Sequence, residues 1–304
     1  MRFHRADAAG LRALERAVRT GAPVVYAAPD VDAGPPADEL VPLCHGVEDG
    51  SLARWLPPAA RPGGGIKVSV VIPASRGRPI GLAALAAQDL ETELIVLANG
   101  RWREGVVVPW EGHGRTRQRG VLLASHPYVF FTVDDALPLG AGFLRTLVEG
   151  LEAGGYDAVL ARQLPWPTSD PVTRARLRGW TPAEGRGAAT LDNVAALYRR
   201  SALLADPFDD VPIAEDWRWG RRHRYGYVAG AAVVHAHPRR FRALYARTRD
   251  LHRQFLATGE AARVPDLATF LRAAPSVVGR DLRGGLAELC GQWAAARAEA
   301  EPGV

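Results

Sequence analysis

The chain has 304 residues, and its hydrophobic fraction of 47% is that of an ordinary globular protein. Its formal net charge is +5, but almost all of the positive charge is arginine, which indicates a bias toward GC-rich codons and argues against a nucleic-acid-binding surface. Lys67 is the only lysine and begins a predicted strand, so lysine-dependent covalent chemistry is also disfavoured. No apolar run is as long as a transmembrane helix, and the N-terminus lacks the apolar centre of a signal peptide, so we expect a cytoplasmic protein.

Residues 1–65 are expected to form a distinct N-terminal appendage and linker. Apolar residues between positions 11 and 18 have the spacing of a short amphipathic helix, and residues 23–28 have the composition of a strand. A Pro-Gly-Gly-Gly stretch at residues 62–65 is typical of a linker, and no catalytic pattern precedes it. We therefore place the main domain at residues 66–240 and a helical tail at residues 241–304.

The main domain begins with a strand, a glycine-containing loop, a helix and a second strand. Val68–Ile72 and Leu94–Leu97 are apolar runs of strand length separated by about one helix, which predicts a right-handed βαβ unit. A further strand is predicted at Val106–Val108, and a helix follows it with Arg115 and Arg117 near its start. A helix N-terminus disfavours cations, so these arginines indicate either an anionic ligand or a solvated charged face.

Two adjacent carboxylates follow the most apolar stretch of the chain. Residues 128–133 form a β-branched and aromatic run, typical of a strand that is buried on both faces, and Asp134 and Asp135 come directly after it. Open α/β sheets bind their ligands at the carboxyl ends of the strands. Two neighbouring acids repel each other unless a cation lies beside them, so a divalent ion carrying phosphates is one explanation and a simple turn is the other.

The second half of the domain continues with a helix over Gly142–Ala153 and a strand over Ala158–Leu164. Residues 165–188 are rich in Pro, Arg and Gly and predict a long loop, which in a compact domain often serves as a lid or as an acceptor-binding segment.

A predicted helix and the strand after it carry the remaining candidate residues. Glu215 and Asp216 open a predicted amphipathic helix that Gly226 ends, and a strand over Val228–Val234 runs into two histidines. Two tryptophans of this helix are too close in sequence to share one face. We expect one of them in the core and the other beside an acceptor as a stacking platform.

These motifs, taken together and in order, resemble the family 2 glycosyltransferases of the GT-A fold, and in particular their rhamnosyltransferase-like branch. The matching stretches are VSVVIP, VDD, NVAALYRRSAL, AEDWRWGRRHRYGY and GAAVVHAH, and the similarity covers about residues 66–255. It implies an α/β fold with a mixed, mostly parallel central sheet flanked by helices. It also implies a transferase that uses a nucleoside-diphosphate sugar donor, Mg²⁺ or Mn²⁺, and a hydroxyl acceptor of unknown identity.

The resemblance implies roles for single residues. Asp134 would contact the nucleotide ribose, and Asp135 would hold the metal on the donor diphosphate. Asp216 takes the position of the catalytic base, with Glu215 orienting the acceptor. A third metal ligand corresponds to His235, with His237 as the alternative. The residues expected to line the nucleotide, donor-sugar and acceptor sites are Pro73, Ala74, Arg76, Asn193, Arg199 and Arg200, assisted by one of the two arginines Arg115 and Arg117.

One position departs from the family pattern. Relatives commonly end the second strand in two acids followed by a small residue, and the second acid grips a pyrimidine ring, but this chain has Ala98, Asn99 and Gly100. Asn99 accepts a hydrogen bond from a ring N–H, yet it is neutral and also donates. A uridine donor is therefore not required, and thymidine or purine donors stay open.

The expected reaction is a single displacement in which Asp216 takes the proton of the acceptor hydroxyl and the anomeric carbon is inverted. A retaining double displacement would need a second carboxylate beside the donor sugar, and Asp192 and Glu215 are the candidates. Both key residues also have a purely structural explanation. Asp216 would then be an acid that stabilises the start of a helix, and His235 would be a structural histidine at the end of a strand.

Two other functions fit parts of this pattern. A sugar-nucleotide nucleotidyltransferase would share a similar sheet, but IPASRGRPIG lacks the lysine that such enzymes use. A non-catalytic nucleotide-sugar-binding protein would keep the fold without the chemistry. The basic amphipathic segment at residues 239–255 is consistent with peripheral contact to the inner face of a membrane or with packing on its own domain, and a homodimer is a further alternative.

Overall fold

The structure is a computed structural model that describes residues 65–75, 79–99, 105–166 and 190–235. A few separate residues are also described, namely 2–3, 25–26, 169, 177, 180–182, 246, 249 and 253. In the N-terminal region, β1 (Arg2–Phe3) and β2 (Val25–Tyr26) pair in parallel, and β2 falls within the strand expected at residues 23–28. The rest of the appendage and nearly all of the tail lie outside the described residues, so the domain boundaries stay predictions.

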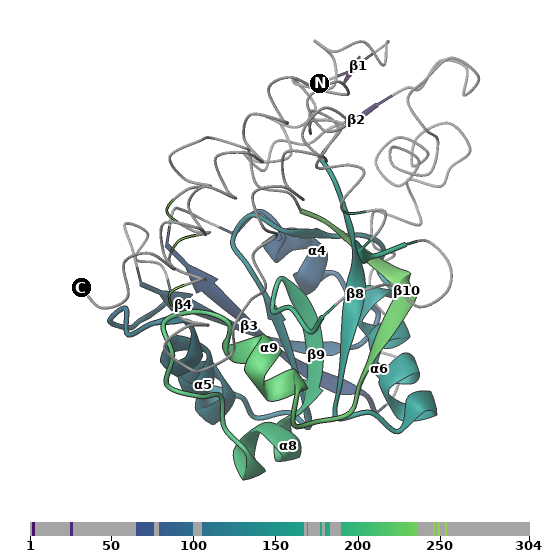
Figure 1. The fold of residues 1–304 in the computed structure, drawn as a ribbon. Coiled ribbons are helices and arrows are strands. Elements are labelled where there is room, and N and C mark those ends of the chain that lie inside the picture. The colour runs from purple at the N-terminus through teal and green to yellow at the C-terminus, as the bar shows by residue number, and fades with distance from the viewer. Residues whose placement is uncertain are drawn as a thin grey trace, which may run out of the picture.

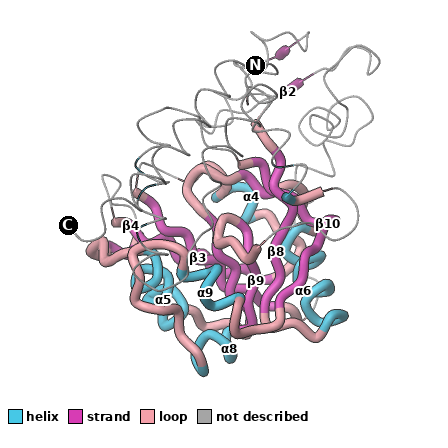
Figure 2. The backbone as a smooth tube through the Cα atoms, viewed as in Figure 1, coloured by secondary structure: helices cyan, strands magenta, loops and turns pink. Residues whose placement is uncertain are grey.

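A sheet forms the centre of the described chain, as Figures 1 and 2 show. This sheet has eight strands. The strands lie in the order β5, β4, β3, β6, β9, β8, β10, β7. Their bounds are β3 (Lys67–Ala74), β4 (Glu91–Ala98), β5 (Val106–Val107), β6 (Tyr128–Thr132), β7 (Leu137–Pro138), β8 (Ala158–Leu164), β9 (Ala195–Arg199) and β10 (Tyr225–Val234). The helices are α4 (Leu82–Ala86), α5 (His113–Leu123), α6 (Phe143–Gly154), α8 (Arg200–Ala205) and α9 (Glu215–Gly220).

Most of the strands run in one direction. β3 pairs in parallel with β4 and β6, β4 pairs in parallel with β5, and β8 pairs in parallel with β10. β9 lies antiparallel to both β6 and β8, and β7 lies antiparallel to β10. The carboxyl ends of β3, β4, β6, β8 and β10 therefore meet at one edge of the sheet, together with the amino end of β9. We call this the carboxyl edge.

Helices cover both faces of the sheet, and alternating side chains of the strands point to one or the other. On β3, Val70 packs in a core with α4 and α6, whereas Val71 packs in a second core with α5, α8 and α9. Burial on both faces explains why β3 and β6 are continuous apolar runs. The predicted α/β class, with a mixed, mostly parallel sheet between helices, is confirmed.

One expected boundary is wrong. The helix opened by Glu215 ends at Gly220 rather than at Gly226, and Gly226 lies inside β10. The pairing of β10 with β8 begins already at Tyr225 opposite Ala158, so strand formation takes residues that the local pattern assigned to a helix.

Lys67 begins β3 as expected, and its ammonium group contacts Glu91 at the edge opposite to the carboxyl edge.

Within the part of the chain that the structure describes, no helix combines the length and the apolar character needed to cross a membrane.

The contact between α5 and β3 depends on a glycine. A Cβ atom at Gly120 would lie 2.3 Å from Cγ1 of Val71. We predict that Gly120→Ala lowers the free energy of unfolding by about 1–3 kcal/mol, because neither the helix nor the central strand can move away cheaply. Urea denaturation followed by circular dichroism measures this.

The matched control is Gly142→Ala at the start of α6. Among the described residues, the only atom near an added Cβ there is Oδ2 of Asp89, at 3.9 Å. This substitution should change the free energy of unfolding by less than about 1 kcal/mol. Equal losses in the two variants would contradict the close packing of α5 on β3.

Candidate active site

Asp135 and His235 come together at the carboxyl edge. Asp135 follows β6 and His235 follows β10, and Nε2 of the histidine lies 3.4 Å from Oδ1 of the aspartate. Their side chains are only 14% and 5% exposed, so both groups face inward at the ends of their strands. The structure thus joins two residues that are 100 positions apart and that the sequence assigned to one metal site.

The donor set of this pair fits a divalent cation. Carboxylate oxygen suits Mg²⁺ and Mn²⁺, and an imidazole nitrogen favours Mn²⁺ over Mg²⁺, which takes oxygen ligands almost exclusively. Among the described residues, no third His, Cys, Asp or Glu joins the pair to form a complete cage. A cation bound here would need further oxygen ligands from a substrate or water, as in sites that bind phosphates. His237 lies outside the described residues.

Asp134 ties the end of β6 to the loop after β3. Its Oδ2 atom accepts a hydrogen bond from the backbone N–H of Ser75 at 3.0 Å, and its carbonyl oxygen accepts one from Ile80 at 3.1 Å. Pro73 and Ala74 end β3 directly before this contact. The structure therefore brings these three predicted nucleotide-site residues together, while Arg76 lies outside the described residues.

Asn99 follows β4 at the same edge. Its backbone N–H donates to the carbonyl of Ala74 at 3.1 Å. Both polar atoms of its side-chain amide are buried, and neither has a hydrogen-bond partner among the described residues. Such a buried amide needs partners that the described chain does not supply, which suits a ligand with both a donor and an acceptor.

A buried ion pair lies under the start of α9. Glu215 is 1% exposed, and its Oε1 atom accepts hydrogen bonds from Nη1 of Arg117 at 2.6 Å and from Nδ2 of Asn193 at 3.0 Å. Tyr198 completes the network by donating to Oδ1 of Asn193 at 2.7 Å.

Glu215, Arg117 and Asn193 use their side chains on one another inside the protein. Their predicted contacts with the acceptor or the donor stay predictions. Their physical role is to fix the polar interior on which Asp216 rests.

Asp216 is the partly exposed member of this group. Its Oδ2 atom accepts the backbone N–H of Asn193 at 2.8 Å, and its Oδ1 atom accepts the backbone N–H of Trp217 at 2.8 Å. The pKa of the Asp216 carboxyl is raised well above its usual value, first by burial and then by the negative charges of Glu215 and Asp192. A carboxylate with a raised pKa is a stronger base, which is the property that proton abstraction near neutral pH requires.

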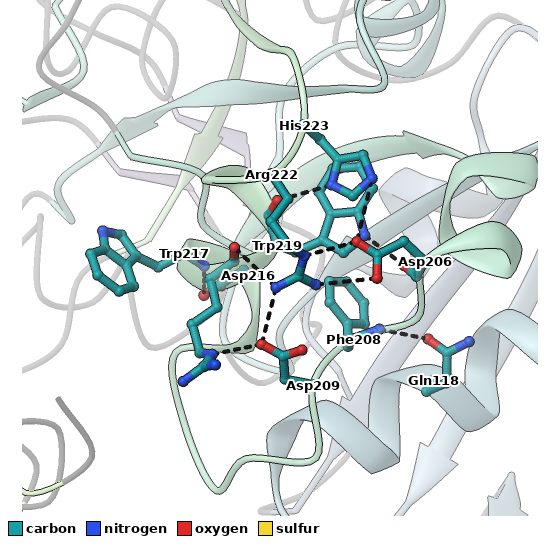
Figure 3. A network of polar contacts seen from close by, with 10 residues as sticks. Gln118, Asp206, Phe208, Asp209, Asp216, Trp217, Trp219, Arg222 and His223 are labelled. Carbon is teal, nitrogen blue, oxygen red and sulfur yellow. Dashed lines mark hydrogen bonds and ion pairs between the residues drawn. The ribbon is translucent and has the colours of Figure 1, made fainter. Parts of the chain in front are cut away.

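Helix α9 is held in place by the loop that precedes it, as Figure 3 shows. Arg218 donates to Oδ2 of Asp209 at 2.6 Å, and Arg222 donates to Oδ2 of Asp206 at 2.9 Å. The indole N–H of Trp219 also donates to the carbonyl of Asp206, at 2.8 Å. The last turn of α9 and the residues directly after it are therefore anchored to the segment Asp206–Asp209.

The two tryptophans of α9 point in different directions, as Figure 3 shows. Trp219 is fully buried and packs edge-to-face on Tyr198 at a centroid distance of 5.1 Å. Trp217 is partly exposed, and the guanidinium of Arg221 lies 5.1 Å from its ring centroid. The expectation that one of the two belongs to the core is confirmed, and acceptor stacking by Trp217 stays a prediction.

The residue before the two carboxylates has an unusual backbone. Ala214 caps α9 with φ of 68° and ψ of 24°, the left-handed region that L-residues other than glycine rarely adopt. Such a conformation costs about 1–2 kcal/mol and persists only where the surroundings impose it. Here the chain must turn sharply so that Glu215 enters the interior directly at the helix start.

The remaining predicted arginines have other partners. Arg115 is exposed near the start of α5 and forms an ion pair with Asp210, so its role in donor binding stays a prediction. Arg199 is a correction: it ends β9, which is antiparallel, so it lies at the edge opposite to Asp134. Its guanidinium there donates to both carboxylate oxygens of Glu152, at 2.7 and 2.9 Å.

The structure adds two residues that the motifs did not single out. Gln163 is 4% exposed near the end of β8, and its Oε1 atom lies 3.3 Å from Nδ1 of His235. Its Nε2 atom donates to Oδ2 of Asp192 at 3.1 Å. Asp192 was named only as an alternative nucleophile. A signal for Gln163 was available, because a glutamine in a mostly apolar buried strand needs polar partners.

No protein-family model and no curated protein matches the chain. Among solved structures, the chain is similar to the mannosyltransferase PcManGT from Pyrobaculum calidifontis in complex with GDP-Man and Mn²⁺. The TM-score is 0.52 at 16% identity, over 95% of this chain and 85% of that one. This chain has the GT-A fold of nucleotide-sugar glycosyltransferases.

Two further solved structures show a weaker likeness. They are glucosyl-3-phosphoglycerate synthase from Mycobacterium tuberculosis with Mn²⁺, UDP and glucosyl-3-phosphoglycerate (TM-score 0.46, 20% identity, 69% of this chain and 89% of that one) and S. aureus TarS 1-349 with UDP-GlcNAc (TM-score 0.43, 14% identity, 74% of this chain and 70% of that one). Because no family model matches, membership of family 2 and of its rhamnosyltransferase-like branch stays a prediction.

Removing the guanidinium of Arg117 should destabilise the protein strongly. The Arg117→Met variant leaves Glu215 buried without its ion-pair partner, so we predict a loss of about 3–5 kcal/mol in the free energy of unfolding. The double variant Arg117→Met, Glu215→Gln should recover most of that loss, because the amide keeps an acceptor for Asn193 without the charge. Urea denaturation measures both. A double variant no more stable than the single one would show that the buried charge is not the cause.

His113 should make the protein sensitive to acid. Burial, followed by the charge of Arg117, lowers the pKa of His113 from 6.5 to about 4. The unfolded chain then binds more protons than the folded one between these pH values, so the contribution of His113 to stability is complete above pH 6.5 and falls as the pH drops toward 4. The full effect is at most roughly 3 kcal/mol.

Urea denaturation of wild type and His113→Gln between pH 4 and pH 8 tests this, because the difference between the two proteins isolates His113 from other titrating groups. The wild type should lose stability relative to the variant as the pH falls. A difference that does not change with pH would contradict the neutral, buried state of His113.

Proposed function

We propose that this chain is an inverting, metal-dependent glycosyltransferase that moves a sugar from a nucleoside-diphosphate donor to an acceptor hydroxyl. The fold supports a nucleotide-sugar donor, because the chain shares it with the mannosyltransferase that was solved with GDP-Man and Mn²⁺.

One observation carries the proposal. The candidate metal ligands and the candidate base lie at the same edge of the sheet and are linked by a series of polar contacts that includes one backbone step, from Asp192 to Asn193. From Asp135 it passes to His235 at 3.4 Å, to Gln163 at 3.3 Å and to Asp192 at 3.1 Å. Asn193, the next residue, donates its backbone N–H to Asp216 at 2.8 Å. A reaction with a leaving group at one end and an incoming nucleophile at the other fits this arrangement.

At the donor end, negative charge develops on the oxygen of the departing diphosphate. Asp135 and His235 would hold the Mn²⁺ or Mg²⁺ ion that neutralises this charge, since a bound divalent cation acts as a Lewis acid toward phosphoryl oxygens. Asp134, fixed by Ser75, would hold the nucleoside portion of the donor at the ends of β3 and β6. These residues bind and orient the donor and need not exchange protons with it.

At the acceptor end, Asp216 would take the proton of the incoming hydroxyl. Its raised pKa increases its basicity, and its two hydrogen bonds come from backbone N–H groups, so the carboxylate has a fixed orientation. Glu215 is buried in an ion pair, which argues against it as the nucleophile of a retaining reaction. Asp192 accepts hydrogen bonds from Val194 and Gln163, which supports a structural use of that carboxylate as well.

Asn99 is the residue that would read the base. Its side-chain amide is buried and has no hydrogen-bond partner among the described residues, and it offers one donor group and one acceptor group. A carboxylate at this place would select a ring N–H, whereas an amide accepts more than one arrangement. The proposal therefore includes thymidine and guanosine donors beside uridine donors.

Replacing the base should remove turnover and keep donor binding. We predict that Asp216→Asn lowers kcat by about 10²- to 10⁴-fold, because it removes a positioned base. The melting-temperature shift produced by UDP or GDP with Mn²⁺ should stay as in the wild type, because the nucleotide site lies at the other end of the network. Release of nucleoside diphosphate from UDP-, dTDP- and GDP-sugars measures the turnover.

The wild-type rate should also rise with pH until Asp216 is ionised. Because the pKa of Asp216 is raised, this rise should occur at a higher pH than is usual for an aspartate.

Asp157→Asn is the matched control for Asp216→Asn, since Asp157 accepts the backbone N–H of Arg224 at the opposite edge of the sheet. Turnover that survives in Asp216→Asn, or is lost equally in Asp157→Asn, would overturn the assignment of the base.

A further inference from the structure

Gln163 lies between the candidate metal pair and the carboxylates near Asp216. Its side chain is almost completely buried at the end of β8, with Nε2 toward Asp192 and Oε1 toward His235. Its backbone is fixed too, because the Thr181 hydroxyl accepts its N–H at 3.2 Å and donates to its carbonyl at 3.1 Å. The amide therefore has little freedom to move between these two partners.

The orientation of this amide follows from the charge of Asp192. An ionised carboxylate only accepts hydrogen bonds, and Asp192 accepts one from the backbone N–H of Val194 at 2.9 Å and one from Gln163 at 3.1 Å. The NH₂ group of Gln163 must therefore face Asp192. Its carbonyl oxygen is left to face Nδ1 of His235, at 3.3 Å.

This orientation determines which nitrogen of His235 carries the proton. A carbonyl oxygen opposite Nδ1 requires a proton on Nδ1, so in the form of the ring that can bind a metal the lone pair is on Nε2. That lone pair lies 3.4 Å from Oδ1 of Asp135, which is also an acceptor. Two buried acceptors that face each other repel each other. The arrangement becomes favourable when both bind one cation.

We propose that Gln163 is a positioning residue that holds His235 in its Nδ1-protonated form, so that Nε2 and Asp135 can bind one Mn²⁺ ion. This inference rests on the proposed function, which supplies the metal, and it adds a residue that never touches metal or substrate. A hydrogen bond to the second ring nitrogen orients a histidine ligand and raises its basicity, and its loss typically lowers metal affinity about 10- to 100-fold.

The test compares the affinity for Mn²⁺, alone and with UDP or GDP, in the wild type and two variants, using the electron paramagnetic resonance signal of free Mn²⁺. Gln163→Leu removes the acceptor for Nδ1–H, so its affinity should fall about 10- to 100-fold. Gln163→Glu keeps an acceptor for Nδ1–H but places a second acid beside Asp192. It should lose stability and yet retain Mn²⁺ affinity close to that of the wild type.

A matched control is Gln88→Leu, which removes another buried glutamine. Gln88 is 1% exposed and bonds the carbonyls of Ala84 and Gly140 and the backbone N–H of Leu144, away from the metal pair. It should lose stability without any change in Mn²⁺ affinity. This control separates a general loss of stability from a specific effect on His235.

The outcomes are distinct. Equal Mn²⁺ affinity in the wild type and Gln163→Leu would overturn the role of Gln163 and leave the metal site standing. An equal loss in Gln163→Leu and Gln163→Glu would show that an acceptor for Nδ1–H does not maintain the Mn²⁺ affinity, which also overturns the inference. A wild type that binds no Mn²⁺, with or without nucleotide, would overturn the metal site and this inference with it.

Discussion

The buried ion pair between Arg117 and Glu215 is the interaction on which the site depends. It connects α5 to α9 through side chains that are 6% and 2% exposed, and it neutralises a carboxylate that would otherwise be expensive to bury. With Glu215 fixed inside, the next residue of the helix must point about 100° away around the helix axis. That rotation places Asp216 at the border between the interior and the surface. The ion pair thus serves to position Asp216 more than to bind a ligand.

The same arrangement explains the basicity of Asp216. At Asp216 the negative charges of Glu215 and Asp192 outweigh the positive charge of Arg117. Burial adds to this imbalance, and both effects favour the protonated acid. The protein therefore accepts an electrostatic cost close to its candidate base, as catalytic sites commonly do. The backbone strain at Ala214 adds to the same cost at the adjacent position.

Much of this fold could be predicted from the sequence, because buried strands leave a plain record in apolar runs. The strand ending before Asp134 and the strand ending before His235 were found in this way, and their common edge followed from the rule for open α/β sheets. Arg199 shows the limit of such reasoning. The sequence gives no direction for β9, and since β9 is antiparallel, only the residues before it reach the carboxyl edge.

Glu215 and Asn193 show a second limit, because the residue type does not reveal whether a polar side chain faces a ligand or another buried group. Both occupy motif positions of the resembled family, and both are satisfied inside the protein. Gln163 illustrates the reverse case, since it belongs to no motif and yet joins the two ends of the site. A contact between residues distant in sequence becomes visible only when the strands are placed side by side.

The antiparallel direction of β9 has a consequence for how this scaffold can diversify. β8 ends at the carboxyl edge and β9 begins there, so the intervening segment, residues 165–194, leaves and re-enters the sheet on the same side. Insertions or deletions in its middle need not shift any strand pairing, because neither anchor point has to move. Under the proposed function, changes of length between these two anchor points would act on acceptor preference while the sheet stays unchanged.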